Sequence, residues 1–406
     1  MVSRKRLLSQ PCTICFPFIG DFVGGSHISA LGLIKNLDPL RHRPLIVVHR
    51  SEGPFAQLLR SQNIPFEAAP VNDHLELAVS QRNVAAAVHL LRTLVPITRF
   101  LRRRKVDIVH TNDGRTHITW GIGARLAGAK LLWHHRADPG AFGLRHVAPW
   151  IAHRLVAVSE FASPPPGAIS ARSRSRVIHS PFDTTIGERV RGDVSRRELI
   201  EEIGCAPGAR LLGYFGTLVD RKRPLIFVES IAAIHRLAPE LDVHGLLFGD
   251  ALAGLDEMTR NRADALGIGD RIHIMGFRMP GEPLLAAMDA LLVTAVSEPF
   301  GRTLIEAMLL GTPVIAAESG GNTEAIRHRF NGILVPPDEP RGFAAAAIEL
   351  LNDRDEATAM SARAARDARS RFSVSRHVAD VSRVYEELLA DVTTAPSTGR
   401  DATSVL

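Results

Sequence analysis

Short runs of apolar residues recur along the chain, and longer segments with apolar positions at helical spacing separate them. Apolar runs without polar alternation are typical of strands that are buried on both faces of a parallel sheet. Because the segments between them are long enough for crossover helices, the pattern predicts a doubly wound α/β architecture. The predicted strands cover residues 13–18, 44–49, 107–110, 130–134, 154–158 and 176–179 in the first half, and 210–215, 242–248, 271–275, 290–296, 312–317 and 332–335 in the second half.

The chain has 406 residues, which is longer than one hydrophobic core usually supports, and its 45% hydrophobic content is sufficient for two cores. We therefore expect two domains that are joined by the polar segment 187–208. The predicted boundaries place an N-terminal Rossmann-like domain at 1–186 and a C-terminal Rossmann-like domain at 209–371. An amphipathic helix at 372–389 and a disordered tail at 390–406 complete the prediction.

Several features of the sequence predict a cytoplasmic protein. No apolar run approaches the about 18 residues that a membrane-spanning helix needs. The basic start of the chain resembles the first part of a signal peptide, but Gln10 and Pro11 interrupt the apolar stretch, so we expect the segment to be retained. The three cysteines, Cys12, Cys15 and Cys205, make no disulfide framework, which indicates a reducing compartment.

Basic residues exceed acidic residues by 49 to 43, and the densest basic cluster comprises Arg99, Arg102, Arg103, Arg104 and Lys105. One interpretation is a solvated helix end. The alternative is a surface that attracts anionic lipid, which would place the protein peripherally at the inner membrane face. Nucleic acid is not an expected partner, because aromatic residues make up 5% of the chain and no binding module is visible.

The sequence predicts a ligand site between residues 290 and 310. An apolar strand ends before Pro299 and Gly301, and apolar positions at helical spacing follow. Ligands of open α/β sheets bind at such strand ends, and the free N–H groups of a first helical turn favour anionic oxygens such as those of a diphosphate. Glu298 and Glu306 flank this turn, and acids in such places accept hydrogen bonds from hydroxyl groups. The pattern therefore suggests a ligand that combines phosphate with sugars.

These residues also carry a family resemblance. Glu298 and Glu306, with seven residues between them, resemble the E-x7-E signature of retaining GT-B glycosyltransferases, in particular glycosyltransferase family 4 (glycosyl transferases group 1). The stretch EPFGRTLIEAMLLGTPVIA and the later GGNTE and NGILVPP occur in the family's order. The resemblance implies two Rossmann-like doubly wound domains that face each other across a cleft, with the acceptor on the N-terminal side, the nucleotide sugar on the C-terminal side and the last helix returning to the first domain.

The resemblance implies further site residues in both halves. Glycines 24 and 25 resemble the family's glycine turn, and His135, with His134 as the alternative, resembles a histidine beside the donor sugar, because strand alternation lets only one of the two face the cleft. Lys222 resembles the lysine that pairs with the diphosphate, whereas Thr217 stands in the place of the usual arginine, for which Arg221 or Arg223 could substitute. The implied catalytic residues are Glu298, His135, His134 and Lys222, and the implied donor-binding residues are Gly24, Gly25, Thr217, Lys222, Phe300, Gly301, Arg302, Thr303 and Glu306.

The implied activity is transfer of a hexose from a nucleotide-diphosphate sugar, by default a UDP-sugar, with retention of anomeric configuration. The expected acceptor is a glycan or a lipid-linked molecule in cell-surface polysaccharide or glycoconjugate synthesis. We expect no cofactor and no metal, because Asp353-Arg354-Asp355 follows a helical run rather than a buried strand. Cys12-Thr13-Ile14-Cys15 lacks a second cysteine pair for zinc. The alternatives are a GT-B-like epimerase and a non-catalytic nucleotide-sugar-binding protein.

Overall fold

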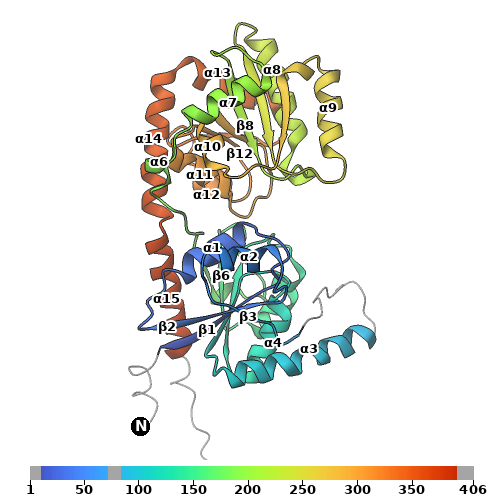
Figure 1. Ribbon diagram of the computed structural model, residues 1–406, viewed down its shortest axis with the longest axis vertical. Helices are drawn as coiled ribbons and strands as arrows, with labels where there is room; N and C mark the ends of the chain where they lie inside the picture. Colours follow the sequence, from blue (N-terminus) through green and yellow to red (C-terminus); the bar gives the residue numbers. More distant parts are fainter. Residues whose placement is uncertain (1–10, 72–83, 391–406) are drawn as a thin grey trace, which may run out of the picture. The chain divides into compact units, whose positions relative to one another are not determined.

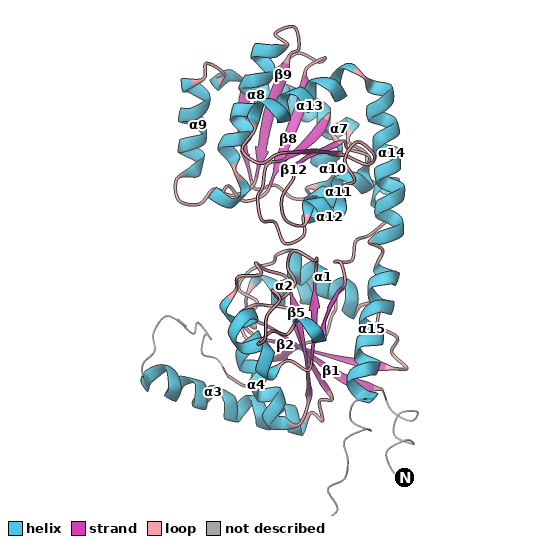
Figure 2. Cartoon of the chain, turned by 180° about the vertical axis from the view of Figure 1, so that it is seen from behind, coloured by secondary structure: helices cyan, strands magenta, loops and turns pink. Residues whose placement is uncertain are grey.

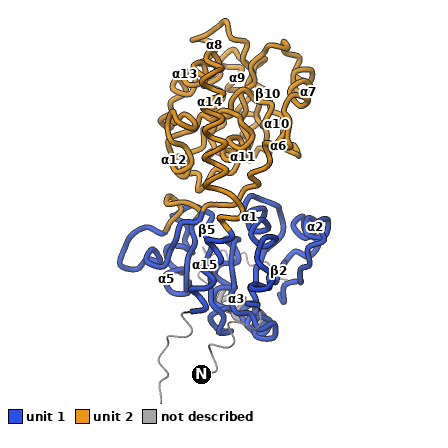
Figure 3. The backbone as a smooth tube through the Cα atoms, turned by 90° about the vertical axis from the view of Figure 1, so that its left-hand side faces the viewer, with its two compact units in different colours: residues 1–157, 164–178, 378–406 blue, residues 158–163, 179–377 orange. Residues whose placement is uncertain are grey.

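The protein is described from a computed structural model that places residues 11–71 and 84–390. The chain forms two compact units (Figure 3). Unit 1 comprises residues 1–157, 164–178 and 378–406, and unit 2 comprises residues 158–163 and 179–377. Each unit contains one parallel sheet with helices packed around it (Figure 1, Figure 2).

Unit 1 contains a sheet with the strand order β3-β2-β1-β4-β5-β6-β7, in which neighbouring strands are parallel. The order reverses between β1 and β4, and such switch points are where α/β sheets bind ligands. The strands are β1 (Cys12–Phe18), β2 (His42–Val48), β3 (Glu67–Ala68), β4 (Ile108–Thr111), β5 (Lys130–His135), β6 (Arg154–Ala157) and β7 (Ser175–Val177). The helices are α1 (Gly25–Ile34), α2 (Pro54–Ser61), α3 (Val84–Arg103), α4 (His117–Ala127), α5 (Ala148–Ile151) and α15 (Val374–Ala390). Of α15, the part from Val378 onward belongs to unit 1.

Unit 2 contains a parallel sheet with the strand order β10-β9-β8-β11-β12-β13. Its strands are β8 (Arg210–Phe215), β9 (Val243–Phe248), β10 (Ile272–Gly276), β11 (Ala290–Val293), β12 (Val314–Ala317) and β13 (Ile333–Val335). Its helices are α6 (Ile186–Arg189), α7 (Asp193–Ile203), α8 (Pro224–Leu237), α9 (Leu255–Ala265), α10 (Glu282–Ala286), α11 (Arg302–Leu310), α12 (Asn322–Ala325), α13 (Pro340–Asn352) and α14 (Arg354–Arg371), with the short turn η4 (Asp220–Lys222) after β8.

Most strand residues are apolar because both faces of each sheet are largely buried. In β1, Ile14 and Phe16 enter one core of unit 1, while Cys15 between them enters the core on the other side. In β8, Leu212 and Leu211 divide in the same way between two cores of unit 2. This burial explains why the sequence pattern found the strands without polar alternation, and it confirms the predicted class of two Rossmann-like α/β domains. The pattern missed β3, which has only two residues.

The division into units differs from the predicted boundaries. The chain first enters unit 2 at residues 158–163 and belongs to it again from His179 to His377. The predicted linker 187–208 contains most of α6 and all of α7. Leu199 of α7 is buried against Leu211 and Leu246 of the sheet, so this segment packs as part of unit 2. Patterns of local polarity do not reveal such packing, because a mostly polar helix can still bury the few apolar side chains that it carries, here Leu199, Ile200 and Ile203.

The terminal helix α15 packs into unit 1. Val381, Val384 and Tyr385 are buried in the same core as Ile14 of β1. The hydroxyl group of Tyr385 lies 2.5 Å from Nδ1 of His110 on β4. Residues 391–406, which make up nearly all of the predicted tail, lie outside the described residues. The three cysteines have free thiols, and no helix within the described ranges 11–71 and 84–390 is long and apolar enough to span a membrane.

Candidate functional site

The candidate site of unit 2 lies where β8 and β11 end. The two strands are neighbours in the sheet, so the turns that follow them meet at one edge. The N–H group of Val296 donates to the carbonyl oxygen of Arg221 at 2.9 Å, and Oγ1 of Thr294 donates to the carbonyl oxygen of Lys222 at 2.9 Å. These bonds join the turn that carries Lys222 to the loop that carries Glu298. The structure therefore brings together two of the predicted catalytic residues that are far apart in the sequence.

Glu298 has a well-defined position in this loop. Its carboxylate is 17% exposed and forms an ion pair with the guanidinium group of Arg221. Its carbonyl oxygen accepts a hydrogen bond from the N–H group of Gly321 at 2.7 Å. Ser297 before it has a φ of +52°, a left-handed conformation that costs free energy in a residue other than glycine. Arg221, which could substitute for the family's arginine, is thus engaged by the predicted sugar-binding carboxylate.

Lys222 points its ammonium group toward the turn after β8. Gly216 has a φ of +147°, and a Cβ atom at this position would lie 2.4 Å from Nζ of Lys222. The glycine thus leaves room for the lysine side chain beside the strand end. Among residues 11–71 and 84–390, no ion pair occupies this ammonium group, so its charge remains available to an anionic ligand. The backbone of Thr217 follows, and its carbonyl oxygen accepts a hydrogen bond from the hydroxyl group of Tyr214 at 3.3 Å.

Burial raises the pKa of the Tyr214 phenol, and the negative charge of Glu298 raises it further. The hydroxyl group therefore remains a proton donor at neutral pH. Its bond to the carbonyl oxygen of Thr217 supports the turn beside Lys222. The side chain of Thr217, the residue in place of the family's arginine, cannot supply the positive charge that an arginine would. The cationic groups of this turn come instead from Arg221 and Lys222.

The first turn of α11 presents unpaired N–H groups at the same edge. Gly301 is the N-cap residue, and it provides no side-chain cap. In the described part of the chain, the N–H groups of Thr303 and Leu304 have no acceptor, whereas that of Ile305 bonds the carbonyl oxygen of Gly301 at 3.3 Å. A helix terminus with free N–H groups and a partial positive charge favours anionic oxygens. A phosphate cradle at this turn stays a prediction.

Glu306 is already paired within its own helix. Its carboxylate binds the guanidinium group of Arg302 at 2.9 Å, and Arg302 also donates to the carbonyl oxygen of Pro181 at 3.3 Å. The guanidinium carbon of Arg302 lies 4.4 Å from the ring centroid of Phe182. The structure thus directs Arg302 toward the 181–182 segment. A ribose hydroxyl at Glu306 would share this carboxylate with Arg302.

The aromatic ring of Phe300 is buried, and its predicted donor-binding role stays a prediction. The residue is 6% exposed, and its ring stacks on His179 at a centroid distance of 4.9 Å and contacts Phe372 edge-on at 5.4 Å. The ring therefore anchors the loop in the core of unit 2. The sequence could not show this, because its partners lie 121 positions before it and 72 after it. The backbone of Phe300 remains part of the cradle.

In unit 1, Gly24 and Gly25 lie at the start of α1, with Gly24 as the N-cap residue in extended conformation. The N–H group of Gly24 donates to Nδ1 of His27 at 3.3 Å. A Cβ atom at Gly24 would lie 2.9 Å from the ring of Phe22, so the glycine accommodates this ring. Burial lowers the pKa of His27. The glycine turn therefore has a local packing role, and its role in donor binding stays a prediction.

The two histidines at the end of β5 point to opposite sides of the sheet, as strand alternation predicts. Nδ1 of His134 lies 3.0 Å from Nε2 of His110 and 3.4 Å from the guanidinium group of Arg136. Nε2 of His135 lies 3.0 Å from the carbonyl oxygen of Asp138, so that nitrogen carries the proton. Nδ1 of His135 is buried and has no partner within the described residues. Burial lowers the pKa of His135, which favours the neutral form with Nδ1 as an acceptor.

The two metal-like motifs have structural roles. The carboxylate of Asp353 caps α14 by accepting the N–H group of Glu356 at 3.0 Å. Cys15 is buried in β1, and burial raises the pKa of its thiol and raises that of Cys12 to about 12. Neither thiol is activated for metal binding or catalysis. Within residues 11–71 and 84–390, no group of three or more histidine, cysteine, aspartate or glutamate side chains could hold a metal ion.

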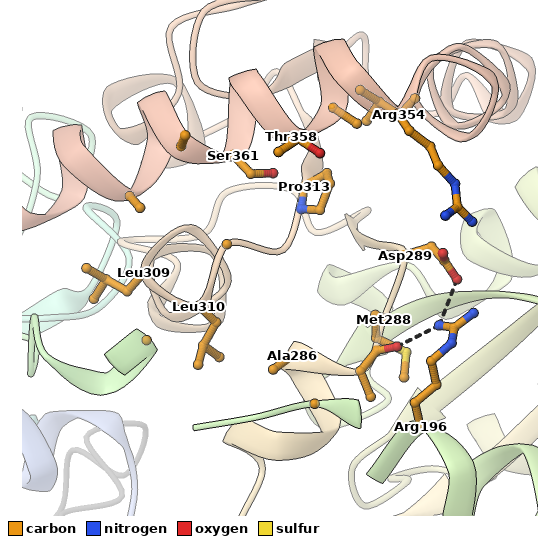
Figure 4. Close-up of a pocket in the computed structure, with 18 of the residues that line it drawn as sticks. Arg196, Ala286, Met288, Asp289, Leu309, Leu310, Pro313, Arg354, Thr358 and Ser361 are labelled. Carbon is orange, nitrogen blue, oxygen red and sulfur yellow. Dashed lines mark hydrogen bonds and ion pairs between the residues drawn. The ribbon is translucent and has the colours of Figure 1, made fainter. Parts of the chain in front are cut away.

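Unit 2 also contains a cavity of about 760 Å³ (Figure 4). It is bordered by the starts of β8 and β12 and by α14, and Arg196 binds Asp289 at 2.9 Å along its wall. None of the predicted site residues lines it. Because ligands of parallel sheets bind at the carboxyl ends of the strands, we place the candidate site at Lys222 and Glu298 rather than in this cavity.

Two residues that support the site were not singled out from the sequence. Oγ of Ser159 bonds the carbonyl oxygen of Pro299, and the carboxylate of Glu324 binds the backbone of residues 160 and 161. Glu324 lies in the GGNTE motif, which is part of the family resemblance but did not indicate a role for this residue. Ser159 has no sequence signal, since its partner is 140 residues away.

The architecture described above is that of the GT-B glycosyltransferases. HepE of Anabaena in complex with UDP and glucose is similar with a TM-score of 0.76 and 22% identity, over 93% of this chain and 100% of that chain. A glycosyltransferase of Rickettsia africae is similar with a TM-score of 0.76 and 19% identity, over 94% and 99% of the two chains. At these identities the likeness establishes the fold.

Residues 209–353 match the family model of glycosyl transferases group 1. The D-inositol 3-phosphate glycosyltransferase of Thermobispora bispora is 34% identical over 200 residues, which are 47% of this chain and 46% of that protein. The N-acetyl-alpha-D-glucosaminyl L-malate synthase of Bacillus anthracis is 29% identical over 208 residues, 51% and 53% of the two chains. The chain thus spans about half the length of these curated relatives.

Proposed function

We propose that the protein is a glycosyltransferase that moves a sugar from a nucleotide-diphosphate sugar to a hydroxyl group. The observation that carries this proposal is the placement of the Lys222 ammonium group, the free N–H groups of α11 and the Glu298 carboxylate at one edge of unit 2. Cations and helix N–H groups stabilise a departing diphosphate. A carboxylate beside them accepts hydrogen bonds from sugar hydroxyls rather than binding phosphate.

In the proposed reaction, the bond between the anomeric carbon and the diphosphate oxygen breaks, and a bond from the acceptor oxygen to that carbon forms. The acceptor proton passes to the departing phosphate, so no protein base is required. Lys222 and the first turn of α11 would stabilise the negative charge that develops, Glu298 would hold the sugar and Glu306 the ribose. Retention of configuration, family 4 membership and a role for His135 beside the donor sugar follow from the resemblance and belong to this proposal.

The proposed donor is a UDP-sugar, and HepE, whose fold is similar, was solved with UDP and glucose. For the acceptor, the names of the two relatives favour a small hydroxylated anion over the glycan or lipid-linked molecule predicted from the resemblance. Cell-surface polysaccharide synthesis remains the alternative. The basic cluster of residues 99–105 gives little support to a membrane surface, because Arg104 pairs with Glu67 at 2.6 Å and Arg102 donates to the carbonyl oxygen of Leu126 at 2.6 Å.

The proposal is tested in two steps. Thermal shift with UDP-, GDP- and ADP-sugars identifies the donor, because a ligand that binds only the folded state raises Tm. Donor hydrolysis and transfer to inositol phosphate, malate or a lipid-linked glycan are then measured with and without EDTA. We expect stabilisation by a UDP-sugar, turnover and no effect of EDTA. Stabilisation without any turnover would support the non-catalytic alternative, conversion to a second nucleotide sugar would support the epimerase, and no stabilisation would refute the donor assignment.

A further inference from the structure

The loop that carries Glu298 is fastened to a segment from a distant part of the chain. Oγ of Ser159 donates a hydrogen bond to the carbonyl oxygen of Pro299 at 2.5 Å. Ser159 is fully buried and belongs to the short stretch 158–163 of unit 2, which directly follows β6 in the chain. Because Pro299 is the next residue after Glu298, this bond fixes the backbone beside the candidate carboxylate.

Glu324 holds the same stretch through its backbone. One carboxylate oxygen accepts the N–H group of Glu160 at 2.8 Å, and the other accepts that of Phe161 at 2.9 Å. The N–H group of Ala162 bonds Oγ of Ser159 at 2.9 Å. Three successive N–H groups are therefore satisfied by two side chains. Hydrogen bonds to an ionised carboxylate are stronger than those between neutral groups, so Glu324 fixes where Ser159 lies.

Glu324 itself is anchored next to Glu298. It lies on α12, directly after the glycine pair whose second member, Gly321, donates its N–H group to the carbonyl oxygen of Glu298 at 2.7 Å. Arg371 donates to the carbonyl oxygen of Glu324. The contacts form a closed ring from Glu298 through Pro299, Ser159 and Glu324 back to Gly321. All of these residues belong to unit 2.

We propose that Ser159 and Glu324 are positioning residues for Glu298. They act through the backbone of the loop, and the inference rests on the proposed function of Glu298. Loss of either bond would let the loop shift, while the turn of Lys222, which would bind the diphosphate in the proposed function, keeps its hydrogen bond from Thr294. Small misplacements of a group that acts in the transition state lower turnover strongly, while ground-state binding of the diphosphate is retained.

The test compares Ser159→Ala and Glu324→Gln with two control variants. Ser370→Ala removes an exposed hydroxyl that bonds its own helix, and Glu349→Gln removes an exposed ion pair with Arg329. We expect kcat to fall by about tenfold to hundredfold in the first two variants, with donor KM changed less than about threefold. The controls should keep both values. Wild-type kcat in both test variants would overturn the proposal. So would a tenfold to hundredfold fall in kcat/KM that arises from a higher donor KM alone.

Hydrogen exchange gives a second measurement that does not depend on activity. The amides of residues 160 and 161 and the peptide covering residues 297–301 should exchange faster in Glu324→Gln than in wild type, and Glu349→Gln should leave them unchanged. Unchanged exchange would refute the proposed positioning role of Ser159 and Glu324 even if turnover fell. If wild type showed no turnover with any nucleotide sugar, the proposed function would fail. The exchange data would still decide whether Glu324 holds the loop of Glu298. Glu324→Gln preserves side-chain volume, so it remains informative if Ser159→Ala does not fold.

Discussion

The Glu298 carboxylate is only 17% exposed and pairs with the guanidinium group of Arg221. Burial and the ion pair together hold the carboxylate in one orientation. Glu298→Gln removes the charge but keeps the shape. We expect turnover to fall by at least about a hundredfold, because hydrogen bonds from hydroxyls to a charged acceptor are stronger than those to an amide. Binding of UDP alone, measured by calorimetry, should change little. The matched control is Glu229→Gln, which removes the pair with Arg262 on the outside of unit 2. Equal activity in wild type and Glu298→Gln would remove Glu298 from the site.

Lys222 supplies the charge that the predicted diphosphate needs. Lys222→Ala should raise the Kd of UDP at least about tenfold, which corresponds to about 1.4 kcal/mol of binding free energy. Gly216→Ala should have a similar effect without removing the charge, because a Cβ atom there would lie 2.4 Å from Nζ. Arg260→Ala, which removes an exposed ion pair on α9, is the control. Unchanged UDP affinity in Lys222→Ala would place the diphosphate elsewhere.

At the scale of elements, two glycines with positive φ allow two effects of substitution to be compared. One effect is backbone strain alone, and the other is strain together with a steric clash. Gly311 ends α11 with a φ of +84° and has open space around it, whereas a Cβ atom at Gly320, with a φ of +57°, would lie 2.6 Å from the carbonyl oxygen of Glu298. Gly311→Ala should cost about 1 kcal/mol of unfolding free energy. Gly320→Ala should cost more and also lower turnover. Denaturant unfolding and kinetics check this, and identical results for the two variants would show that the approach of Gly320 to the loop is unimportant.

The terminal helix α15 is joined to the sheet of unit 1 by a polar contact within an apolar core. Burial raises the pKa of Tyr385 well above its usual value, so its hydroxyl remains protonated beside Nδ1 of His110. Tyr385→Phe should lower the unfolding free energy by about 1 to 2 kcal/mol and lower Tm by a few degrees. Hydrogen exchange should increase in residues 378–390. Unchanged Tm and exchange would mean that the apolar contacts alone hold the helix.

Across the whole molecule, buried and partly buried histidines make stability depend on pH. Burial lowers the pKa of His117, His135 and His179, and it lowers that of His153 and His273 to about 4. The unfolded chain, with histidine pKa values near about 6.5, therefore binds more protons than the folded chain below that pH. This contribution to stability is fully present above about pH 6.5 and is lost as the pH falls toward 4. Tm measured by circular dichroism should decrease over this range, and a constant or rising Tm would contradict the assignment.

The sequence by itself determined the architecture and most of the candidate site. Because both faces of each sheet are largely buried, most strand positions are apolar. Glu298, Lys222 and Gly301 lie in turns after strands and at a helix start, which local patterns mark. Local signals were sufficient because these features depend on residues within a few positions of one another. The two-residue strand β3 was too short to produce such a signal.

Only the tertiary structure decided which side chains meet across long separations. It placed the ring of Phe300 against His179 in the core, paired Glu298 with Arg221, and packed residues 187–208 onto unit 2. It also joined Ser159 to the loop of Glu298 over 140 residues. These contacts arise from the order of the strands in the sheet and from the paths between them. A serine or an aromatic residue carries the same local pattern whether it faces a ligand, a core or a distant loop, so the sequence alone did not distinguish these roles.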